Sequence, residues 1–378
     1  MIFDTIVIGL GANGSSALYY LSKENKKILG IDRYTPPHQF GSSHGQSRII
    51  RQAYHENPVY VPFVKEAYKE WHAIEQESGK SLLLKTGGLM LGAANASVIT
   101  GAVTSAKTHD IAYEYLESGE ILRRFPAFRI SENTVGVLEK EAGILFPEEC
   151  IKTYLEQAVL NGAQLQLNEI VLDIKSAESV IEITTSTTVH RTEKLIISAG
   201  AWTGDLLTAL DLPLKVERQV LYWFNNQSPL LQSGLQPQHM PVYIWEYQPG
   251  ELFYGFPDIG DGIKIARHHA GRNILPDRLN QDVSLEEIEL MKLLVSNYIN
   301  IKPVFNYSSV CMYTNTPDEN FIIDHHPENK NIIIASPCSG HGFKFSSLTG
   351  KLLSEMAMEH KLSLDLSPFK IDRFINNF

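Results

Sequence analysis

Apolar and polar residues alternate along the chain with two different periods. Apolar residues recur at helical spacing over residues 60–74, 147–159, 284–298 and 347–358, and this spacing predicts helices that bury one face. Short apolar runs over residues 5–8, 27–32, 194–198 and 331–335 predict buried strands. Between residues 216 and 270, strand follows strand without a helix, which is typical of an antiparallel sheet. The pattern predicts an α/β protein with two parts.

Three other stretches carry local signals. Prolines, glycines and serines between residues 34 and 51 predict a loop. The alternation between residues 163 and 189 predicts a small β meander. Residues 95–118 are predicted to be helical and then looped.

The N-terminal unit combines a strand, a glycine turn, a helix and a second strand that ends in an acid. Gly9 permits a tight turn, Gly11 lets a pyrophosphate approach the backbone, and Gly14 allows helix and strand to pack closely. The start of the helix offers free N–H groups to phosphates. Asp32 stands about 20 residues after the glycines, where the acceptor for a ribose hydroxyl is expected. The unit predicts dinucleotide binding. Arg33 leaves NADP open, because a basic residue there could meet a 2′-phosphate.

Composition and charge narrow the class of protein. A chain of 378 residues exceeds one usual core, so we expect two domains. The net charge of −10 disfavours nucleic acid and anionic membranes as partners, because phosphates would be repelled. No apolar run approaches the ~20 residues that span a bilayer.

Cysteine and histidine usage favours a reducing compartment without a metal site. Cys150, Cys311 and Cys338 are odd in number and widely spaced, so we expect no disulfide framework. The first strand starts close to Met1, so we expect no signal peptide and a cytoplasmic protein. The histidines include two adjacent pairs, but adjacent residues lack ligand geometry on a strand or helix, so no metal is expected.

Further candidate residues follow other predicted strands. The strand at 194–198 leads into a second glycine turn at Gly200, which fits a cofactor larger than one nucleotide. The strand at 331–335 leads into a third turn with Gly340 and Gly342. Arg48 and Arg51 lie in the loop after the second strand, next to where ligands bind in such folds.

Seven segments, spread in order from end to end, resemble one known family. They are residues 9–14, 36–38, 41–51, 254–257, 311–314, 321–324 and 339–346. The chain resembles the monomeric sarcosine oxidase and N-methyltryptophan oxidase family, amine oxidases that carry covalent FAD. The segments starting at Cys311 and Ser339 are the most specific.

For the cofactor, the resemblance implies FAD that extends along all three glycine turns. Cys311 would be joined through its thiol to the 8α-methyl group of the flavin ring, although a lone cysteine is more often an inert buried residue. The implied cofactor-binding residues are Gly9, Gly11, Gly14, Asp32, Arg33, Val171, Gly200, Cys311, Gly340, Gly342 and Lys344.

For the substrate, the resemblance implies that Arg51 and Lys344 hold a carboxylate beside Gly340. Arginine can grip a carboxylate with two parallel N–H bonds, and lysine adds a point charge. Each such bond contributes roughly 1.5–3 kcal/mol. The residues implied to act near the flavin are Arg48, His44, Tyr254, His268 and Tyr313.

The resemblance also implies that Lys264 activates oxygen. Its neighbours Ile263 and Ile265 give it an apolar setting, although a strand lysine often points to solvent. A cation ~4 Å from forming superoxide contributes about 4 kcal/mol at an effective dielectric of 20, on the order of a thousandfold in rate. One lysine could therefore separate an oxidase from a dehydrogenase.

The sequence departs from the family pattern at three places. Residues 43–48 replace a His-His-Gly-Asp-Thr-Arg segment. Pro337 and Cys338 stand where a glycine and an aromatic residue are usual, and we assign no role to Cys338. Arg267 resembles the basic residue of the N-methyltryptophan oxidases, which bears weakly on side-chain preference.

The resemblance implies a discontinuous, Rossmann-like FAD-binding domain and a second, mostly antiparallel substrate domain. The first would contain residues 1–84, 148–214 and 316–378, and the second residues 85–147 and 215–315. The expected reaction is oxidation of an N-methyl amino acid to the amino acid, formaldehyde and hydrogen peroxide. The expected partners are this small molecule and oxygen, and the expected state is a monomer.

Three alternatives stay open. The first is an oxidase of a cyclic imino acid such as proline or pipecolate. The second is a nicotinamide-dependent dehydrogenase, which explains the first 33 residues but not Cys311 or the last glycine turn. The third is a non-catalytic flavoprotein, against which Arg51, Lys264 and Lys344 argue.

Overall fold

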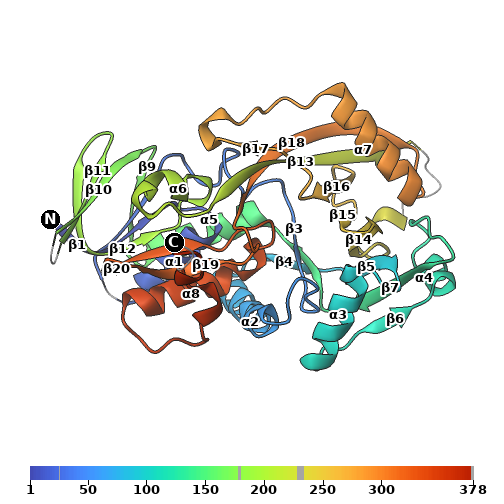
Figure 1. Cartoon of the computed structure of the whole chain (residues 1–378), viewed down its shortest axis with the longest axis horizontal. Helices are drawn as coiled ribbons and strands as arrows, with labels where there is room; N and C mark the ends of the chain where they lie inside the picture. Colours follow the sequence, from blue (N-terminus) through green and yellow to red (C-terminus); the bar gives the residue numbers. More distant parts are fainter. Residues whose placement is uncertain (25, 178–179, 228–233, 376–378) are drawn as a thin grey trace.

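Two large sheets lie at opposite ends of the molecule, with a small sheet between them (Figure 1). This computed structural model describes residues 1–24, 26–177, 180–227 and 234–375. Within these residues, no helix is long and apolar enough to cross a membrane.

The first sheet has a parallel centre. β1 (Ile2–Ile8) lies between β2 (Ile28–Asp32) and β12 (Val189–Ile197), and the three strands run parallel. β9 (Gln164–Leu167) pairs in parallel with β2, and β20 (Asn329–Ser336) pairs in parallel with the C-terminal part of β12. β2 and the C-terminal parts of β1, β12 and β20 are buried along their length, which explains their continuous apolar runs, whereas β9 at the edge alternates.

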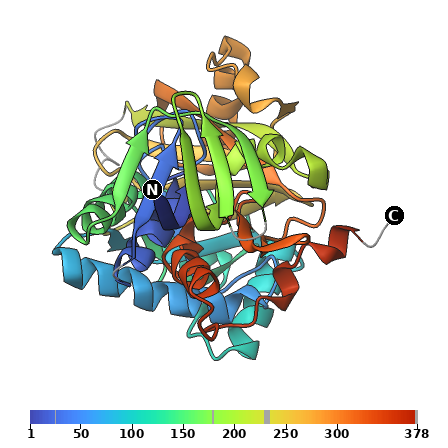
Figure 2. The ribbon, with the colours of Figure 1, turned by 90° about the vertical axis from the view of Figure 1, so that its left-hand side faces the viewer.

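Antiparallel strands complete this sheet. They are β10 (Val171–Ala177), β11 (Val180–Thr185) and β19 (Ile322–His326). Figure 2 shows the β10–β11 hairpin on the near side, with the long helix α2 (Tyr60–Ser78) below the sheet.

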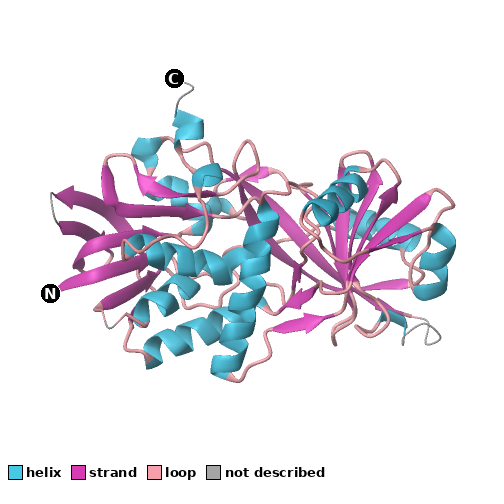
Figure 3. Ribbon diagram, turned by 90° about the horizontal axis from the view of Figure 1, so that it is seen from below, coloured by secondary structure: helices cyan, strands magenta, loops and turns pink. Residues whose placement is uncertain are grey.

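Helices pack against one face of the first sheet (Figure 3). α1 (Ala12–Ser22) packs between α5 (Pro147–Leu160) and α8 (Ser346–Ala357), and α8 also packs against α2. The helices can approach closely because Gly350 has no side chain: a Cβ there would lie 2.5 Å from Ser16 Cβ. The apolar residues that recur at helical spacing over 60–74 form the buried face of α2, and Trp71 is fully buried.

The second sheet has nine strands. Its order is β17-β13-β16-β15-β14-β5-β7-β6, and β18 pairs with β13. The bounds are β5 (Gly88–Ala93), β6 (Glu114–Leu116), β7 (Thr134–Glu139), β13 (Lys215–Asn226), β14 (Val242–Gln248), β15 (Glu251–Phe256), β16 (Ile263–His268), β17 (Asn273–Ile274) and β18 (Pro303–Asn315). α3 (Ser97–Thr108), α4 (Ser118–Arg124) and α7 (Leu285–Tyr298) pack on it.

The small sheet joins segments from different parts of the chain. β8 (Gly143–Leu145) lies between β3 (Arg48–Ile50) and β4 (Leu83–Lys85), and both pairings are antiparallel. The remaining short helices include α6 (Thr203–Leu206), α9 (Asp372–Ile375) and the 3₁₀ segments η1 (Gly200–Trp202), η4 (Pro276–Arg278) and η5 (Phe343–Phe345).

The predicted fold class is confirmed, and three local predictions are wrong. The predicted loop at 34–51 contains β3, because these residues pair with β8. Residues 164–167 form β9 beside β2 rather than part of a meander. The looped part of 95–118 contains β6. The antiparallel pairing expected between residues 216 and 270 is confirmed, and the second sheet is mostly antiparallel, with β5 and β14 as a parallel pair.

Candidate active site

A first cavity follows the C-terminal ends of β1, β2 and β12, and we call it the strand-edge cavity. Gly9, Gly11, Asp32, Arg33, Val171 and Gly200 line it, as predicted for cofactor-binding residues. Its empty volume is about 1410 Å³, part of it open to solvent.

The glycine turn at the base of the strand-edge cavity leaves no room for a side chain at two of its three glycines. Gly9 adopts a φ of +84°, and a Cβ there would lie 2.5 Å from the Ser198 carbonyl oxygen. A Cβ at Gly14 would lie 1.8 Å from the Gly9 carbonyl oxygen. Beside Gly11, in contrast, the nearest atom to such a Cβ is Ser43 Oγ at 3.7 Å. Gly9 and Gly14 thus serve packing, whereas Gly11 leaves open space where α1 presents its N–H groups.

The acid at the end of β2 is held by the backbone. Asp32 is 6% exposed and accepts from Leu10 N at 2.7 Å and from Tyr34 N at 2.8 Å. Burial raises the pKa of Asp32, while the two N–H donors oppose the rise. The carboxylate is therefore fixed in position at the cavity wall, as a ribose-binding acid must be.

Arg33 closes one side of the strand-edge cavity. Its Nη1 donates to Asp277 Oδ1 at 3.1 Å, and its guanidinium lies 4.5 Å from the Trp202 ring centroid. Trp202 Nε1 donates to the same Asp277 oxygen at 2.7 Å. Asp277 lies in η4, which follows β17 of the second sheet. This segment therefore contributes to the wall of a cavity that is built mainly by the first sheet.

Unpartnered polar atoms show that these walls suit a polar ligand. Asn13 Oδ1 and Arg33 Nε are buried without a hydrogen-bond partner among the described residues, and both residues line the strand-edge cavity. Buried polar groups of this kind are normally satisfied. Together with the glycine turn and Asp32, they fit a bound dinucleotide.

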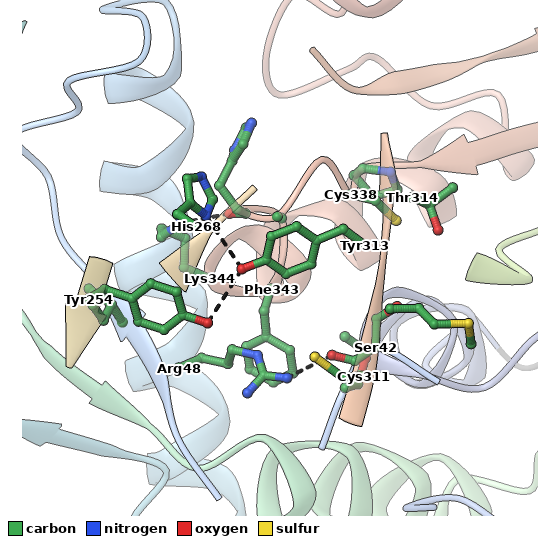
Figure 4. Close-up of a pocket in the computed structure, with 18 of the residues that line it drawn as sticks. Ser42, Arg48, Tyr254, His268, Cys311, Tyr313, Thr314, Cys338, Phe343 and Lys344 are labelled. Atoms are coloured by element: carbon green, nitrogen blue, oxygen red, sulfur yellow. Dashed lines mark hydrogen bonds between the residues drawn. The ribbon is translucent and has the colours of Figure 1, made fainter. Parts of the chain in front are cut away.

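A second cavity, the inner cavity, lies between the two large sheets (Figure 4). Among its lining residues are Arg48, Arg51, Tyr254, His268, Cys311, Tyr313, Gly340, Gly342 and Lys344. The same five residues, Ala12, Asn13, Ser42, Ser43 and Cys338, line both cavities. One elongated ligand can therefore extend from Asp32 to the inner cavity.

Arg51 is buried in the inner cavity and is already paired. Its Nη2 donates to both carboxylate oxygens of Glu56 at 2.6 and 2.7 Å and lies 2.9 Å from His55 Nδ1. Burial would raise the pKa of the Glu56 carboxyl, but the Arg51 guanidinium holds it well below its usual range. A side-chain carboxylate therefore occupies the guanidinium that was predicted to hold a substrate carboxylate.

Lys344 is the second cation of the inner cavity. Its Nζ donates to the His341 carbonyl oxygen at 2.6 Å and to Tyr54 Oη at 3.4 Å. Burial, together with the nearby Arg51, lowers the pKa of Lys344 to about 7. The protonated and neutral forms of Lys344 are therefore about equally populated at neutral pH.

Three aromatic residues form one wall of the inner cavity, and Figure 4 shows them converging. Tyr313 Oη lies 3.4 Å from Tyr254 Oη and 3.4 Å from His268 Nδ1. Gly340 makes room for them, because a Cβ there would lie 2.7 Å from the Tyr313 ring and 2.8 Å from the His268 ring. Burial raises the pKa of Tyr254 to about 12 and lowers the pKa of His268 well below its usual value. The wall is therefore uncharged at neutral pH.

Arg48 and Lys264 hold the loop at residues 42–47. Arg48 donates to the carbonyl oxygens of Ser42, His44 and Ser47 at 2.6–2.8 Å. Lys264 Nζ donates to the carbonyl oxygens of Gly45 and Ser47 at 2.7 and 2.8 Å. Burial and the Arg48 guanidinium lower the pKa of Lys264 well below its usual value.

Two of the predicted catalytic residues stand behind the cavity wall. Lys264 and His44 are not among the lining residues; the Phe256 ring, which does line the cavity, has its centroid 4.6 Å from Lys264 Nζ. Burial, with Arg48 and Lys264 nearby, lowers the pKa of His44 to about 3, so this imidazole is neutral. Gly14 also lies outside both linings, in keeping with its packing role.

Cys311 lies at the edge of the inner cavity on β18. It is 2% exposed and pairs with Gln219 of β13. Burial raises the pKa of the Cys311 thiol, while Arg48 and Lys264 oppose the rise. Burial also raises the pKa of the Cys338 thiol, to about 11.

The sequence analysis missed three polar residues of the inner cavity. They are His55, Glu56 and His341. Glu56 follows Arg51 by five positions in the same loop. An acid this close in sequence to a candidate ligand-binding arginine was a signal that could have identified Glu56. His341 lies within the last of the seven matching segments. Among the described residues, no group of three or more histidine, cysteine or acidic side chains could hold a metal ion.

A glycine turn with a buried acid, continuous with a cation-lined cavity, defines a dinucleotide-binding oxidoreductase. The chain belongs to the FAD dependent oxidoreductase family, which matches residues 4–356. The prediction of FAD is therefore confirmed, while its attachment to Cys311 stays a prediction.

Two relatives match almost the whole chain. The monomeric sarcosine oxidase of Arthrobacter sp. (strain TE1826) is 39% identical, covering 98% of this chain and 96% of the relative. The N-methyl-L-tryptophan oxidase of Escherichia coli is 32% identical, covering 99% and 100%. The resemblance stated from the sequence is thus confirmed.

The fold is shared more widely. NikD, an unusual amino acid oxidase of nikkomycin biosynthesis, has a solved structure with a TM-score of 0.85 at 20% identity, covering 98% of this chain and 97% of NikD. At this identity the likeness concerns the fold.

Proposed function

We propose that the protein is a flavin-dependent oxidase of N-methyl amino acids. One observation carries this proposal: two cations, Arg51 and Lys344, line the same buried cavity as Cys311 and the aromatic wall. Such a pair suits a small substrate with a carboxylate at one end. The relatives named sarcosine oxidase and N-methyltryptophan oxidase support the same substrate class.

Substrate binding is an exchange of carboxylates. Arg51 Nη2 donates to both oxygens of Glu56, while Arg51 Nε is buried without a partner among the described residues, so an incoming carboxylate takes the place of the Glu56 side chain. Lys344 adds a second donor when it is protonated. Simple amines lack the group that makes this exchange, so the site selects amino acids.

The cavity favours the neutral form of the substrate amine. Arg48, Arg51 and Lys344 all line it, and nearby positive charges lower the pKa of an amine. The uncharged His268 adds no further charge. Bound FAD would accept a hydride equivalent from the N-methyl carbon and deliver the electrons to oxygen. The resulting imine is hydrolysed to formaldehyde and the free amino acid, and oxygen becomes hydrogen peroxide.

Lys264 and Cys311 take the remaining roles in this proposal. Lys264 supports oxygen reduction from behind the Phe256 ring, anchored by the carbonyl oxygens of residues 45 and 47. Cys311 holds the flavin ring covalently. We also propose that the two large sheets correspond to the two expected domains, with the boundaries given above, that the protein is monomeric, and that it acts in the cytoplasm.

Acid precipitation and anaerobic titration test the proposal. We expect the yellow colour to stay in the acid pellet of the purified protein, and to move to the supernatant in Cys311→Ser but not in Cys338→Ser, the matched control. Free flavin from the wild type would contradict covalent attachment. Anaerobic bleaching by sarcosine or N-methyltryptophan, with formaldehyde as a product and hydrogen peroxide formed on admitting air, would support the substrate class. Bleaching by proline or pipecolate alone would instead indicate an imino acid oxidase.

Lys264→Met separates the two half-reactions. We expect flavin reduction by substrate to change little and reaction with oxygen to slow by on the order of a thousandfold. Stopped-flow absorbance measures both rates. Equal slowing of the two rates would contradict a specific role with oxygen.

A further inference from the structure

Tyr54 lies beside both cations of the inner cavity. Its side chain is fully buried, and its ring centroid is 4.5 Å from the Arg51 guanidinium carbon and 5.2 Å from Lys344 Nζ. Two positive groups at this spacing repel each other, whereas the face of an aromatic ring attracts both. The ring therefore stabilises a pair of cations that the cavity requires.

The hydrogen bonds behind Tyr54 have a fixed direction. His341 Nε2 lies 3.0 Å from the Glu319 carbonyl oxygen, which can only accept, so Nε2 carries the proton. Burial lowers the pKa of His341 to about 3, so the imidazole is neutral and its Nδ1 accepts from the Tyr54 hydroxyl, 2.6 Å away. The Tyr54 oxygen is left as an acceptor toward Lys344.

This direction determines what Lys344 offers to a ligand. Its Nζ donates one N–H to Tyr54 Oη and a second to the His341 carbonyl oxygen. An ammonium group has three N–H bonds, so one remains for the inner cavity that Lys344 lines. His341 thus contacts the lysine twice, through its carbonyl oxygen and through Tyr54.

We propose that His341 and Tyr54 are positioning residues that aim Lys344 at the carboxylate of the bound amino acid. Neither acts on the reacting atoms. The chain of donors from Lys344 through Tyr54 and His341 to the Glu319 carbonyl oxygen fixes where the third N–H of the lysine points. This inference rests on the proposed function, because it assumes that the ligand of Lys344 is a carboxylate.

A double-mutant cycle tests the coupling. The probe is methoxyacetate, which has the shape and carboxylate of N-methylglycine but no amine to oxidise. Its Kd is measured on the holoenzyme by calorimetry. We expect His341→Leu, which removes the acceptor for Tyr54, to raise the Kd about tenfold. His341→Asn places an amide oxygen near the position of Nδ1 and should stay within about threefold of the wild type.

His341→Leu is then introduced into the Lys344→Met variant, and the Kd for methoxyacetate is measured again. If His341 acts through Lys344, His341→Leu raises the Kd of this background by less than about twofold, because the lysine it aims is gone. A full tenfold effect in both backgrounds would overturn the proposal, since a merely structural role adds independently. No effect in the wild-type background would overturn it too. If His341→Leu does not fold, Tyr54→Phe takes its place in the cycle with the same expected values.

Failure of the proposed function has a different signature. If the wild type binds no methoxyacetate, or if Lys344→Met binds it as tightly as the wild type, the carboxylate site itself is wrong. If Lys344→Met weakens binding while His341→Leu does not, the carboxylate site stands and the positioning role falls.

Discussion

The strand-edge cavity and the inner cavity differ in what recognises the ligand. In the strand-edge cavity, backbone geometry does the work: Gly9 and Gly14 allow the turn, and Asp32 is held by two backbone N–H groups. In the inner cavity, side chains recognise the ligand: Arg51 and Lys344 are buried cations that repel each other, and the partly exposed Glu56 neutralises Arg51. The strand-edge cavity therefore recognises its ligand by a rigid backbone shape, and the inner cavity recognises its ligand by opposing side-chain charges.

This difference has a chemical reason. A dinucleotide needs only to be held, so a rigid backbone cradle is enough. A substrate must enter, lose a proton and leave as product, so its site needs groups whose charge can be exchanged. Changes in the strand-edge cavity should act by steric exclusion, and changes in the inner cavity should act by shifting charge.

Among the changes that test this difference, Gly14→Ala should have the most complete effect, because it removes the cofactor itself. Its Cβ would lie 1.8 Å from the Gly9 carbonyl oxygen, so the glycine turn could not keep its shape. We expect bound FAD, measured as flavin absorbance per protein, to fall by more than about tenfold. Gly204→Ala is the control, because a Cβ there meets nothing within 4 Å. Full FAD content in Gly14→Ala would show that the rigid shape of the glycine turn is not needed for FAD binding.

Arg51→Met should come next. Loss of a bidentate charged contact is expected to raise the KM for the amino acid about 10- to 100-fold, with a smaller change in kcat. Steady-state kinetics over a wide substrate range measures both values. Arg123→Met, which removes an exposed arginine paired with Glu120, is the control. A fall in kcat at unchanged KM would indicate that Arg51 serves the chemistry rather than binding.

The pH dependence of carboxylate binding should reach about tenfold. Burial and, to a smaller extent, Arg51 lower the pKa of Lys344 to about 7, while Glu56 opposes the shift. The ammonium form therefore predominates below pH 7 and is lost above it, so the Kd for methoxyacetate should rise by about tenfold between pH 6 and pH 9. Lys344→Met should flatten this profile. Turnover should change the opposite way, because the substrate amine must lose its proton. A Kd that falls with rising pH would contradict the assignment.

Glu56→Gln should act in the opposite direction from Arg51→Met. The amide keeps the shape of Glu56 but not its charge, so a ligand no longer displaces an anion from Arg51. We expect methoxyacetate to bind about 3- to 10-fold more tightly, as measured by calorimetry. Glu141→Gln, which changes an exposed acid outside the lining of the inner cavity, should have no effect. Weaker binding in Glu56→Gln would show that Glu56 builds the site rather than occupying it.

The smallest effect is expected at the rim of the strand-edge cavity. Asp277 pairs with Arg33, but its side chain is 64% exposed, and exposed pairs contribute ~0–1 kcal/mol. In a Cys311→Ser background, Asp277→Asn should therefore speed FAD release by less than about fivefold, followed by flavin fluorescence. Asp365→Asn, far along the chain, is the control. A much larger effect would show that η4 is part of the cradle.

The two cavities also differ in how far the sequence predicts them. The residues of the strand-edge cavity that matter most, Gly9, Gly11 and Asp32, lie within one strand–turn–helix–strand unit whose periodicity is local. The inner cavity unites Arg51 and Cys311 from opposite ends of the chain. Only the resemblance to a known family brought these two residues into one site.

The errors have the same origin. β3 was predicted as part of a loop because its three residues become a strand only through pairing with β8. β9 alternates as a meander strand would, but its partner is β2, far away in sequence. The direction of hydrogen bonds at His341 depends on the Glu319 carbonyl oxygen, which no side-chain pattern encodes.

The small sheet has a mechanical consequence. β3 carries Arg48 into the inner cavity, β4 runs into β5 of the second sheet, and β8 connects β7 of that sheet to α5 beside the first. Three strands that lead to both halves are bonded to one another at the point where the halves meet. A clamshell motion of the two sheets would have to tear this ladder.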